Sequence, residues 1–295
     1  MLTYLLAILA ACANATSSVL QRKANREVPR RENLSPRLIW SLAHKPVWFG
    51  GVLAVCAGFL LQATALGNGQ ISVVEPILVL ELPATLLLAA RVFRARLGRR
   101  EWASVAAMAA ALAALLYALS PSAGGTAGVH WYAWLAGAGV TLAFAGLMVA
   151  WGRRAPADED GGSGGSARLA AALGVAAGSV FGLTAALMKG MTGTFSSGIG
   201  VLLTSWQVYG MIAAGLLGMF LMQSAMNAGR LIAAQPGLTL SDPIVSIAWG
   251  VLVFHERPRG GWFILMAVAS GLALAAAVVV LARSPLLGGQ SRPRE

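Results

Sequence analysis

Residues 71–91 form an apolar stretch that is long enough to cross a lipid bilayer, yet it contains two acids and two prolines. A membrane-spanning helix needs about 20 predominantly apolar residues, and the sequence ISVVEPILVLELPATLLLAAR meets that length. A charged residue at the centre of such a helix costs roughly 2.5–3.5 kcal/mol on the insertion scale. We therefore expect Glu75 and Glu81 to serve a function, and Pro76 and Pro83 each remove a backbone donor beside them.

The composition is typical of a polytopic membrane protein. Of the 295 residues, 57% are hydrophobic and 11% are charged, and the mean hydropathy is +0.71. A soluble domain of this length could not bury so much apolar surface. The net charge of +11 does not indicate nucleic-acid binding, because Lys and Arg stand almost wholly in the gaps between apolar runs. Cys12 and Cys56 lie inside such runs and predict neither a disulfide nor a metal site.

Nine apolar runs predict an all-α protein with about nine transmembrane helices, although ten is an alternative. The first run lacks a preceding basic segment, so we expect it to be retained as a span and not cleaved as a signal peptide. The seventh run is over-long and leaves room for a short re-entrant turn before Trp206. The runs cover residues 2–20, 47–67, 70–90, 102–119, 130–151, 169–189, 198–227, 231–254 and 262–281.

The positions of the basic residues predict the orientation in the plasma membrane. The gaps after spans one, three, five and seven, together with the C-terminal tail, hold 19 of the 22 Lys and Arg residues. The other gaps hold only Lys189, Arg257 and Arg259. Because cytoplasmic loops carry the excess of basic residues, we expect the N-terminus outside and the C-terminus in the cytoplasm.

An internal repeat divides the chain. At an offset of 160 residues and without a gap, ten positions between 58 and 102 recur, among them Pro76 as Pro236 and Pro83 as Pro243. The odd number of intervening spans predicts that the second copy is inverted, as in many transporters whose binding site lies where the repeats meet. The expected division is a first transmembrane repeat (1–120), an extra span with a Gly/Ser-rich cytoplasmic linker (121–167), a second repeat (168–282) and a cytoplasmic tail (283–295).

The paired halves resemble the drug/metabolite transporter superfamily, and the nearest branch is the NIPA-type magnesium transporters. The residues that carry the resemblance are SSVLQRKA at 17–24, KPVWFGG at 45–51, LQATALGNGQISVVEPI at 61–77, MQSAMNAGRLIAAQPGLTLSDP at 222–243, and the helix-end acid Glu256. The resemblance covers most of the chain. It implies two halves of four to five helices, transport activity and Mg²⁺ as a substrate.

Glu81 and Asp242 are the strongest candidates for a binding site. Each acid stands about eleven residues into its predicted span, so both are expected near the bilayer midplane. Two carboxylates in a low dielectric resist simultaneous ionisation, which suits a proton-coupled carrier. The pair could also hold Mg²⁺, which is usually bound by one or two carboxylates while it keeps several waters. The alternative is that each acid is neutral and hydrogen-bonded inside the bundle.

Other polar residues extend this candidate substrate or ion site. Six residues separate Glu75 from Glu81, so a single regular helix cannot direct both into one small site, and Pro76 could supply the necessary break. A simple helix kink is the alternative. Gln235 stands at the position equivalent to Glu75. Gln62 and Asn227 could line the same cavity, although interhelical hydrogen bonding is the plainer role for such residues.

Two further features suggest structural roles. Gly174, Gly178 and Gly182 form a small-residue stripe that predicts close helix packing, either within the chain or in a homodimer. Lys189 ends the sixth span, where its side chain could snorkel to the membrane surface, and an ion pair with an acid in an occluded state is the alternative. Glu256 closes a span at the membrane edge and is expected to be structural.

These patterns predict a secondary transporter that moves a small solute or cation, with Mg²⁺ as one candidate, by alternating access. No enzyme motif, cofactor motif or ATP-binding loop is present in the sequence, so we expect neither catalysis nor a cofactor, and an ion gradient would supply the energy. A channel-like Mg²⁺ conduit and a non-transporting membrane scaffold are the alternatives. The expected partners are the substrate and the lipid bilayer, without nucleic acid.

Overall fold

The protein is all-helical in the part of the chain that the computed structural model describes. The described residues are 1–26, 46–93, 97–122, 124–126, 128–154, 164–195, 200, 204–228 and 231–282. They form the helices α1 (Leu2–Arg26), α3 (Pro46–Asn68), α4 (Ile71–Leu78), α5 (Glu81–Val92), α6 (Arg99–Leu119), α7 (Trp131–Arg153), α8 (Gly164–Phe195), α10 (Trp206–Ala228), α11 (Leu231–Leu252) and α12 (Trp262–Ala282). Within these ranges the β-type pairing is one isolated bridge, between Ser122 and Arg257.

The described helices have the lengths and composition of membrane spans. Eight helical segments are long and apolar enough to cross a bilayer, when α4 and α5 are counted as one segment. Helix α11, which corresponds to one of the nine predicted spans, has 22 residues and is not among these eight; it carries Gln235, Asp242 and two prolines. The architecture is that of a polytopic membrane protein.

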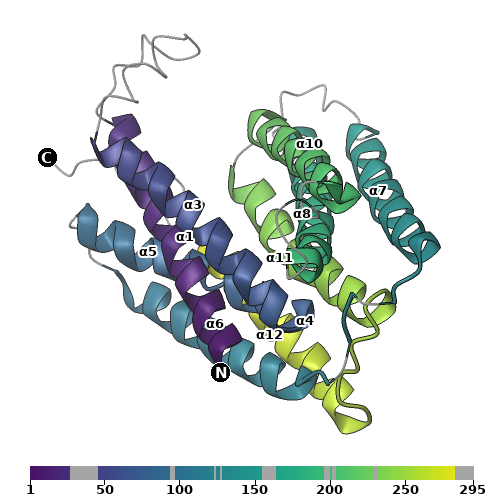
Figure 1. Ribbon diagram of the computed structural model, residues 1–295. Helices are drawn as coiled ribbons and strands as arrows, with labels where there is room; N and C mark the ends of the chain where they lie inside the picture. Colours follow the sequence, from purple (N-terminus) through teal and green to yellow (C-terminus); the bar gives the residue numbers. More distant parts are fainter. Residues whose placement is uncertain are drawn as a thin grey trace, which may run out of the picture.

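The helices form two groups that diverge from one another (Figure 1). In the first group α3, α4 and α5 pack on α1, and α6 packs on α12. In the second group α7, α10 and α11 pack around α8. The main contacts between the groups are those of α4 with α11 and of α3 with α8. The two groups therefore meet along α3, α4, α8 and α11.

The bundle has two distinct ends. The end that we call the N-terminal end holds the beginning of α1, the turn between α3 and α4, and the loop between α11 and α12 (Figure 1). The opposite end, called here the C-terminal end, holds the last turns of α10 and α12. The long described helices run between these two ends, whereas α4 and α5 together make up one such span.

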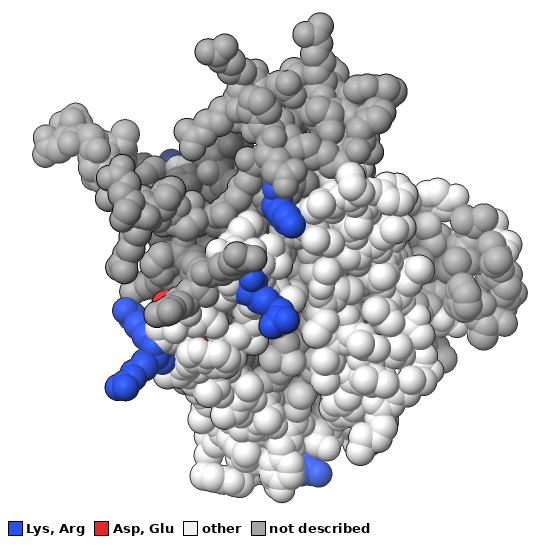
Figure 2. Space-filling view, turned by 90° about the vertical axis from the view of Figure 1, so that its left-hand side faces the viewer, with Lys and Arg blue, Asp and Glu red and all other residues white. Residues whose placement is uncertain are grey.

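The outer surface is apolar, as expected for a protein surrounded by lipid. Large apolar side chains on α7, α10 and α12 are exposed, among them Leu147, Leu216 and Leu272. Figure 2 shows a broad area of one face that carries no charged side chain, with a few Lys and Arg residues beside it. The most buried segments are α8 and α4–α5. Four of the ten buried polar residues in the described part of the chain lie on these segments: Ser72, Glu75, Ser179 and Lys189.

The stretch with two acids is broken, but not at Pro76 as the sequence suggested, because Pro76 stands inside α4 and the break lies at Val79 and Leu80. Helix α4 ends at Leu78 and α5 begins at Glu81, and the amides of Val79 and Leu80 bond to carbonyls three residues back, at 3.3 and 3.0 Å. Pro83 lacks the donor that would bond to the carbonyl of Val79, and its ring would clash with that carbonyl in a regular helix. Helix α11 contains two prolines at the same spacing but is continuous.

The small-residue stripe on α8 packs against α11. A Cβ atom on Gly174 would contact the carbonyl oxygen of Ala234, and one on Gly178 would contact that of Leu238. A Cβ on Gly182 would lie 2.9 Å from Cβ of Val245. Because glycine has no side chain, the two backbones approach closely, so the stripe serves packing inside the chain.

Candidate functional site

A cavity of about 520 Å³ lies between the two groups of helices. Its walls come from α1, α3, α4, α5, α8, α10, α11 and α12. This volume is in the range of sites that bind small molecules. The cavity reaches the C-terminal end of the bundle, where Met226 and Ala282 line it at the last turns of α10 and α12.

Five of the six predicted binding residues line this cavity. They are Glu75 on α4, Glu81 on α5, Gln62 on α3, and Gln235 and Asp242 on α11. The side chain of the sixth, Asn227, lies outside the described residues. The break between α4 and α5 explains how Glu75 and Glu81 can both reach one cavity, since the two residues belong to separate helices.

The three carboxylates have few hydrogen-bond donors around them. Gln62 Nε2 donates to Glu75 Oε1 at 3.0 Å. Ser18 Oγ donates to Glu81 Oε1 at 3.4 Å, and Ser246 Oγ donates to Asp242 Oδ1 at 3.4 Å. The two serine bonds are long and therefore weak. The side-chain amide of Asn14 also hydrogen-bonds to Glu81. An ionised carboxylate can accept about four hydrogen bonds, so Glu81 and Asp242 both keep acceptor capacity for a ligand or water.

The charged residues that the structure describes in the cavity wall are all acidic. The described residues that line it include three acids but no Lys, Arg or His. Asp242 lies close enough to Glu75 and to Glu81 for each pair to repel electrostatically. Such a cluster in a low-dielectric site is stabilised by a cation or by protons. The site can therefore bind a positively charged ligand, exchange protons, or do both in turn.

The geometry does not form a protein-only metal cage. Among the described residues, no group of three or more His, Cys, Asp or Glu side chains is arranged to hold a metal ion. Mg²⁺ commonly keeps several of its waters and binds through only one or two carboxylates. Glu81 and Asp242 remain the candidate ligands for such a hydrated ion.

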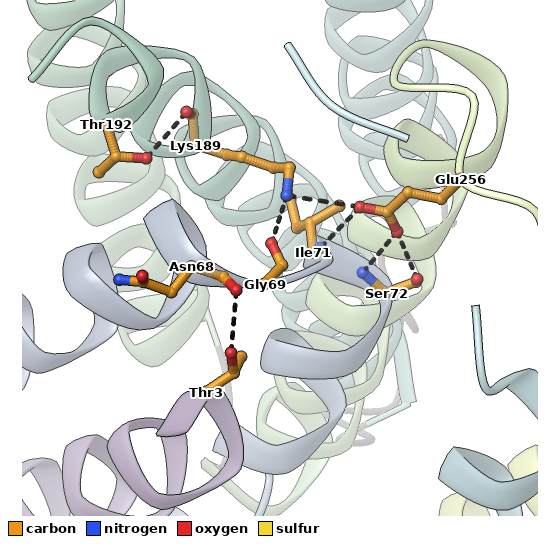
Figure 3. Close-up of polar contacts among 8 residues, drawn as sticks. All are labelled: Thr3, Asn68, Gly69, Ile71, Ser72, Lys189, Thr192 and Glu256. Atoms are coloured by element: carbon orange, nitrogen blue, oxygen red, sulfur yellow. Dashed lines mark hydrogen bonds and ion pairs between the residues drawn. The ribbon is translucent and has the colours of Figure 1, made fainter. Parts of the chain in front are cut away.

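The N-terminal end of the bundle is closed by a buried charge network (Figure 3). Lys189 Nζ on α8 lies 3.5 Å from Glu256 Oε1, and both side chains are almost fully buried. Lys189 also donates to the carbonyl oxygen of Gly69. Lys189 thus forms the ion pair that stood as the alternative, and snorkelling to the membrane surface was the wrong interpretation. Nearby, Thr3 Oγ1 donates to the carbonyl oxygen of Asn68 at 3.1 Å.

Several cavity residues were missed by sequence reasoning. Ser18 lines the cavity from α1, beside Asn14, whose amide in an apolar run did suggest a cavity-lining role, and Thr85 on α5 and Thr239 on α11 line it as well. Asn14 and Ser18 are four residues apart and so share one face of a helix, which was a usable signal in the first apolar run. Phe181 faces the cavity from α8. A single aromatic residue in an apolar helix gives no such signal.

Comparison with known proteins adds a relative but no activity. The chain is similar to an uncharacterized protein of Corynebacterium glutamicum, with 29% identity over 264 residues, which is 87% of this chain and 86% of the relative. No family model matches the chain, and no solved structure matches it. The similarity extends over both groups of helices, so the relative is comparable along nearly the whole chain.

Proposed function

We propose that the protein is a secondary transporter of a small cation, with Glu81, Asp242 and Glu75 as the carboxylates that bind it. One observation carries this proposal: a cavity of about 520 Å³ lies where the two helix groups meet, and the part of its wall that the structure describes holds three acids and no basic residue. Ionisable residues inside membrane spans are costly and commonly mark ion or substrate pathways. Gln62 and Gln235 supply neutral polar groups beside the acids.

Alternating access is supported by the arrangement of the two halves. In the first half α3 and α4–α5 pack on α1, and in the second half α10 and α11 pack on α8. This parallel, together with the offset of 160 residues between Pro76 and Pro236, supports two inverted repeats of the drug/metabolite transporter type. The NIPA-type branch suggests Mg²⁺ as the first cation to test. The basic-residue distribution supports a plasma-membrane topology with a cytoplasmic C-terminus.

The direct test is cation entry into proteoliposomes that contain a fluorescent Mg²⁺ indicator, with and without a pH gradient. We expect saturable flux in the wild type and a loss of at least about 100-fold in Glu81→Gln and Asp242→Asn, since each change removes a charge that binds the ion. Glu101→Gln is the matched control, because it neutralises a carboxylate at the start of α6 that does not line the cavity. Its flux should equal that of the wild type.

The same assay separates the alternatives. Flux that follows the membrane voltage linearly and needs no counter-ion would favour a channel-like Mg²⁺ conduit. Flux of an organic cation without Mg²⁺ flux would keep the transporter and change its substrate. If neither Mg²⁺ nor a panel of organic cations moves, while the folded protein is intact, a membrane scaffold becomes the better description.

A further inference from the structure

We propose that Glu256 is a positioning residue that holds α4, and with it Glu75, in the cavity-facing arrangement while it closes the N-terminal end of the bundle. This role rests on the proposed function, since Glu75 is one of the proposed binding carboxylates. The observation behind it is that Glu256 caps a helix from which it is separated by about 185 residues of sequence.

Helix α4 takes its N-terminal cap from another part of the chain. The first residues of a helix have backbone N–H groups without partners inside the helix. In α4 the residue at the cap position, Gln70, makes no side-chain capping bond. Glu256 accepts from the amide of Ile71 at 2.8 Å and from the amide of Ser72 at 3.1 Å, and also from Ser72 Oγ. Both oxygens of one carboxylate are thus bonded to the first turn of α4 (Figure 3).

The loop that carries Glu256 is firmly anchored. The backbone amide of Glu256 donates to the carbonyl oxygen of Gly250 at 2.8 Å. The next residue, Arg257, exchanges two backbone hydrogen bonds with Ser122, at 2.9 and 3.0 Å. The preceding Phe254 packs edge-to-face on Trp134, with ring centroids 5.3 Å apart. The carboxylate is therefore presented from a fixed loop, and the first turn of α4 is the partner that can detach.

Two glycines leave the space that this carboxylate occupies. A Cβ atom on Gly250 would lie 2.5 Å from Glu256 Oε2, and one on Gly124 would lie 2.6 Å from Glu256 Cγ. Gly124 also has a φ of +87°, which disfavours any side chain there. The position of the acid is thus built into the surrounding chain and is not an incidental contact.

At its other end, α4 is not joined to α5 by regular α-helical hydrogen bonds, because the amides of Val79 and Leu80 bond to carbonyls three residues back. Helix α4 has eight residues, carries Glu75 in its second turn, and is separated from α5 by the break at Val79 and Leu80. A short helix that is broken at one end and capped at the other can shift as a unit when the cap is released. Release of Glu256 would therefore move Glu75 relative to Asp242, which stands on the continuous helix α11.

The contacts of Glu256 and Lys189 with the start of α4 join the two groups of helices. Lys189 belongs to α8 in the second group, while in the first group Gly69 lies in the turn before α4 and Ile71 is the first residue of α4. The cavity reaches the opposite end of the bundle at Met226 and Ala282. Alternating access requires the closed end to open, and the bonds of Glu256 are the contacts that have to break first.

The experiment measures access to the cavity from the N-terminal end. Thr239→Cys places a thiol in the cavity wall on α11, in a chain whose exposed Cys12 and Cys56 are replaced by Ser. An impermeant maleimide is added to one side of proteoliposomes of known orientation. We expect slow labelling from the N-terminal side, and labelling about tenfold faster in Glu256→Gln, because an amide oxygen is a weaker cap than a carboxylate. Glu101→Gln, at the other end of the bundle, should leave the rate unchanged.

Two further variants distinguish a cap from a plain ion pair. Exchange of the two charges, Lys189→Glu with Glu256→Lys, keeps opposite charges together but removes the acceptor for α4. We expect the exchanged protein to label as fast as Glu256→Gln, and slow labelling restored by the exchange would overturn the capping role. Ser72→Ala removes one donor and should accelerate labelling about threefold, which provides the test if Glu256→Gln does not fold.

Unchanged labelling in folded Glu256→Gln, or in Ser72→Ala where the former does not fold, would overturn the role of Glu256. The measurement needs no substrate. An absence of cation flux would therefore overturn the proposed function alone, whereas unchanged labelling beside normal flux would overturn the positioning role alone.

Discussion

Carboxylates stand at the N-terminal end of the bundle and in the wall of the central cavity, but their surroundings are opposite. At the N-terminal end, Glu256 accepts hydrogen bonds from two backbone amides and one hydroxyl, and Nζ of Lys189 lies 3.5 Å from its carboxylate. In the cavity, Glu81 and Asp242 each have one hydroxyl contact, at 3.4 Å, Glu81 has the amide of Asn14 in addition, and no basic residue is among the described residues that line the site. One carboxylate is satisfied by the protein, and the others have capacity left for a partner.

This difference separates a structural acid from a binding acid. An ionised group in a membrane interior requires compensation from somewhere. For Glu256 the chain supplies that compensation itself, from α4 and α8. For the cavity acids it must come from outside, as a cation, protons or water. Changes that add a partner in the cavity, or remove one from the N-terminal end, should make the two regions more alike.

The largest effect is expected when the N-terminal end loses its basic residue, Lys189. Lys189→Met leaves Glu256 buried without a counter-charge, and removal of one partner from a buried ion pair costs about 3–5 kcal/mol. We expect a marked fall in the thermal unfolding temperature in detergent. Adding Glu256→Gln to this variant should recover part of the loss, because it removes the unpaired charge. Equal stability of Lys189→Met and the wild type would show that the pair contributes nothing net.

The second largest effect is expected when a basic residue is introduced into the cavity. Gln62→Lys places an ammonium beside Glu75, to which Gln62 already donates at 3.0 Å. The cavity would then resemble the N-terminal end, and cation flux should fall about 100-fold, since the lysine competes for the same carboxylates. Gln62→Met is the control of similar size. Flux in Gln62→Lys equal to that of the control would contradict a site selected by charge.

The cavity acids were predictable from the sequence, whereas the closed end was not. Glu75, Glu81 and Asp242 stand out because acids are rare in apolar runs, and their predicted depth agrees with a shared cavity. Glu256 stands at a span end, where an acid needs no special explanation. Its contact with Ile71 spans about 185 residues, and only the packing of α4 against α11 brings the two together.

The sequence also did not predict which of the two proline-containing stretches would stay a continuous helix. Pro76 and Pro83 in one stretch have the same spacing as Pro236 and Pro243 in the other, yet only the first stretch is divided into two helices. Proline removes a donor in either case. Whether the helix breaks depends on the neighbours that compensate for the lost bonds. The close backbone contact of α11 with Gly174 on α8 is one such neighbour, and no pattern within α11 itself predicts it.

The third effect tests the break that brings two glutamates to one site. Pro83→Ala restores a donor for the carbonyl of Val79 and removes the clash of the proline ring, so α4 and α5 can join. In a joined helix Glu75 and Glu81 point in different directions. We expect the cation concentration for half-maximal flux to rise about tenfold, the equivalent of one lost ligand at about 1.4 kcal/mol. Pro236→Ala, in the continuous helix α11, should leave it unchanged.

The smallest effect concerns the one described hydroxyl that Glu81 has from the protein. Ser18→Ala removes a hydrogen bond of 3.4 Å, which is long enough to contribute little. We expect the half-maximal concentration to change only about twofold, with unfolding temperature unaltered. Ser224→Ala is the control, since Ser224 bonds to a backbone carbonyl at 2.8 Å and does not line the cavity. A loss comparable to that of Glu81→Gln would mean that Ser18 itself binds the cation, and that the cavity acids are less dependent on a ligand than their surroundings indicate.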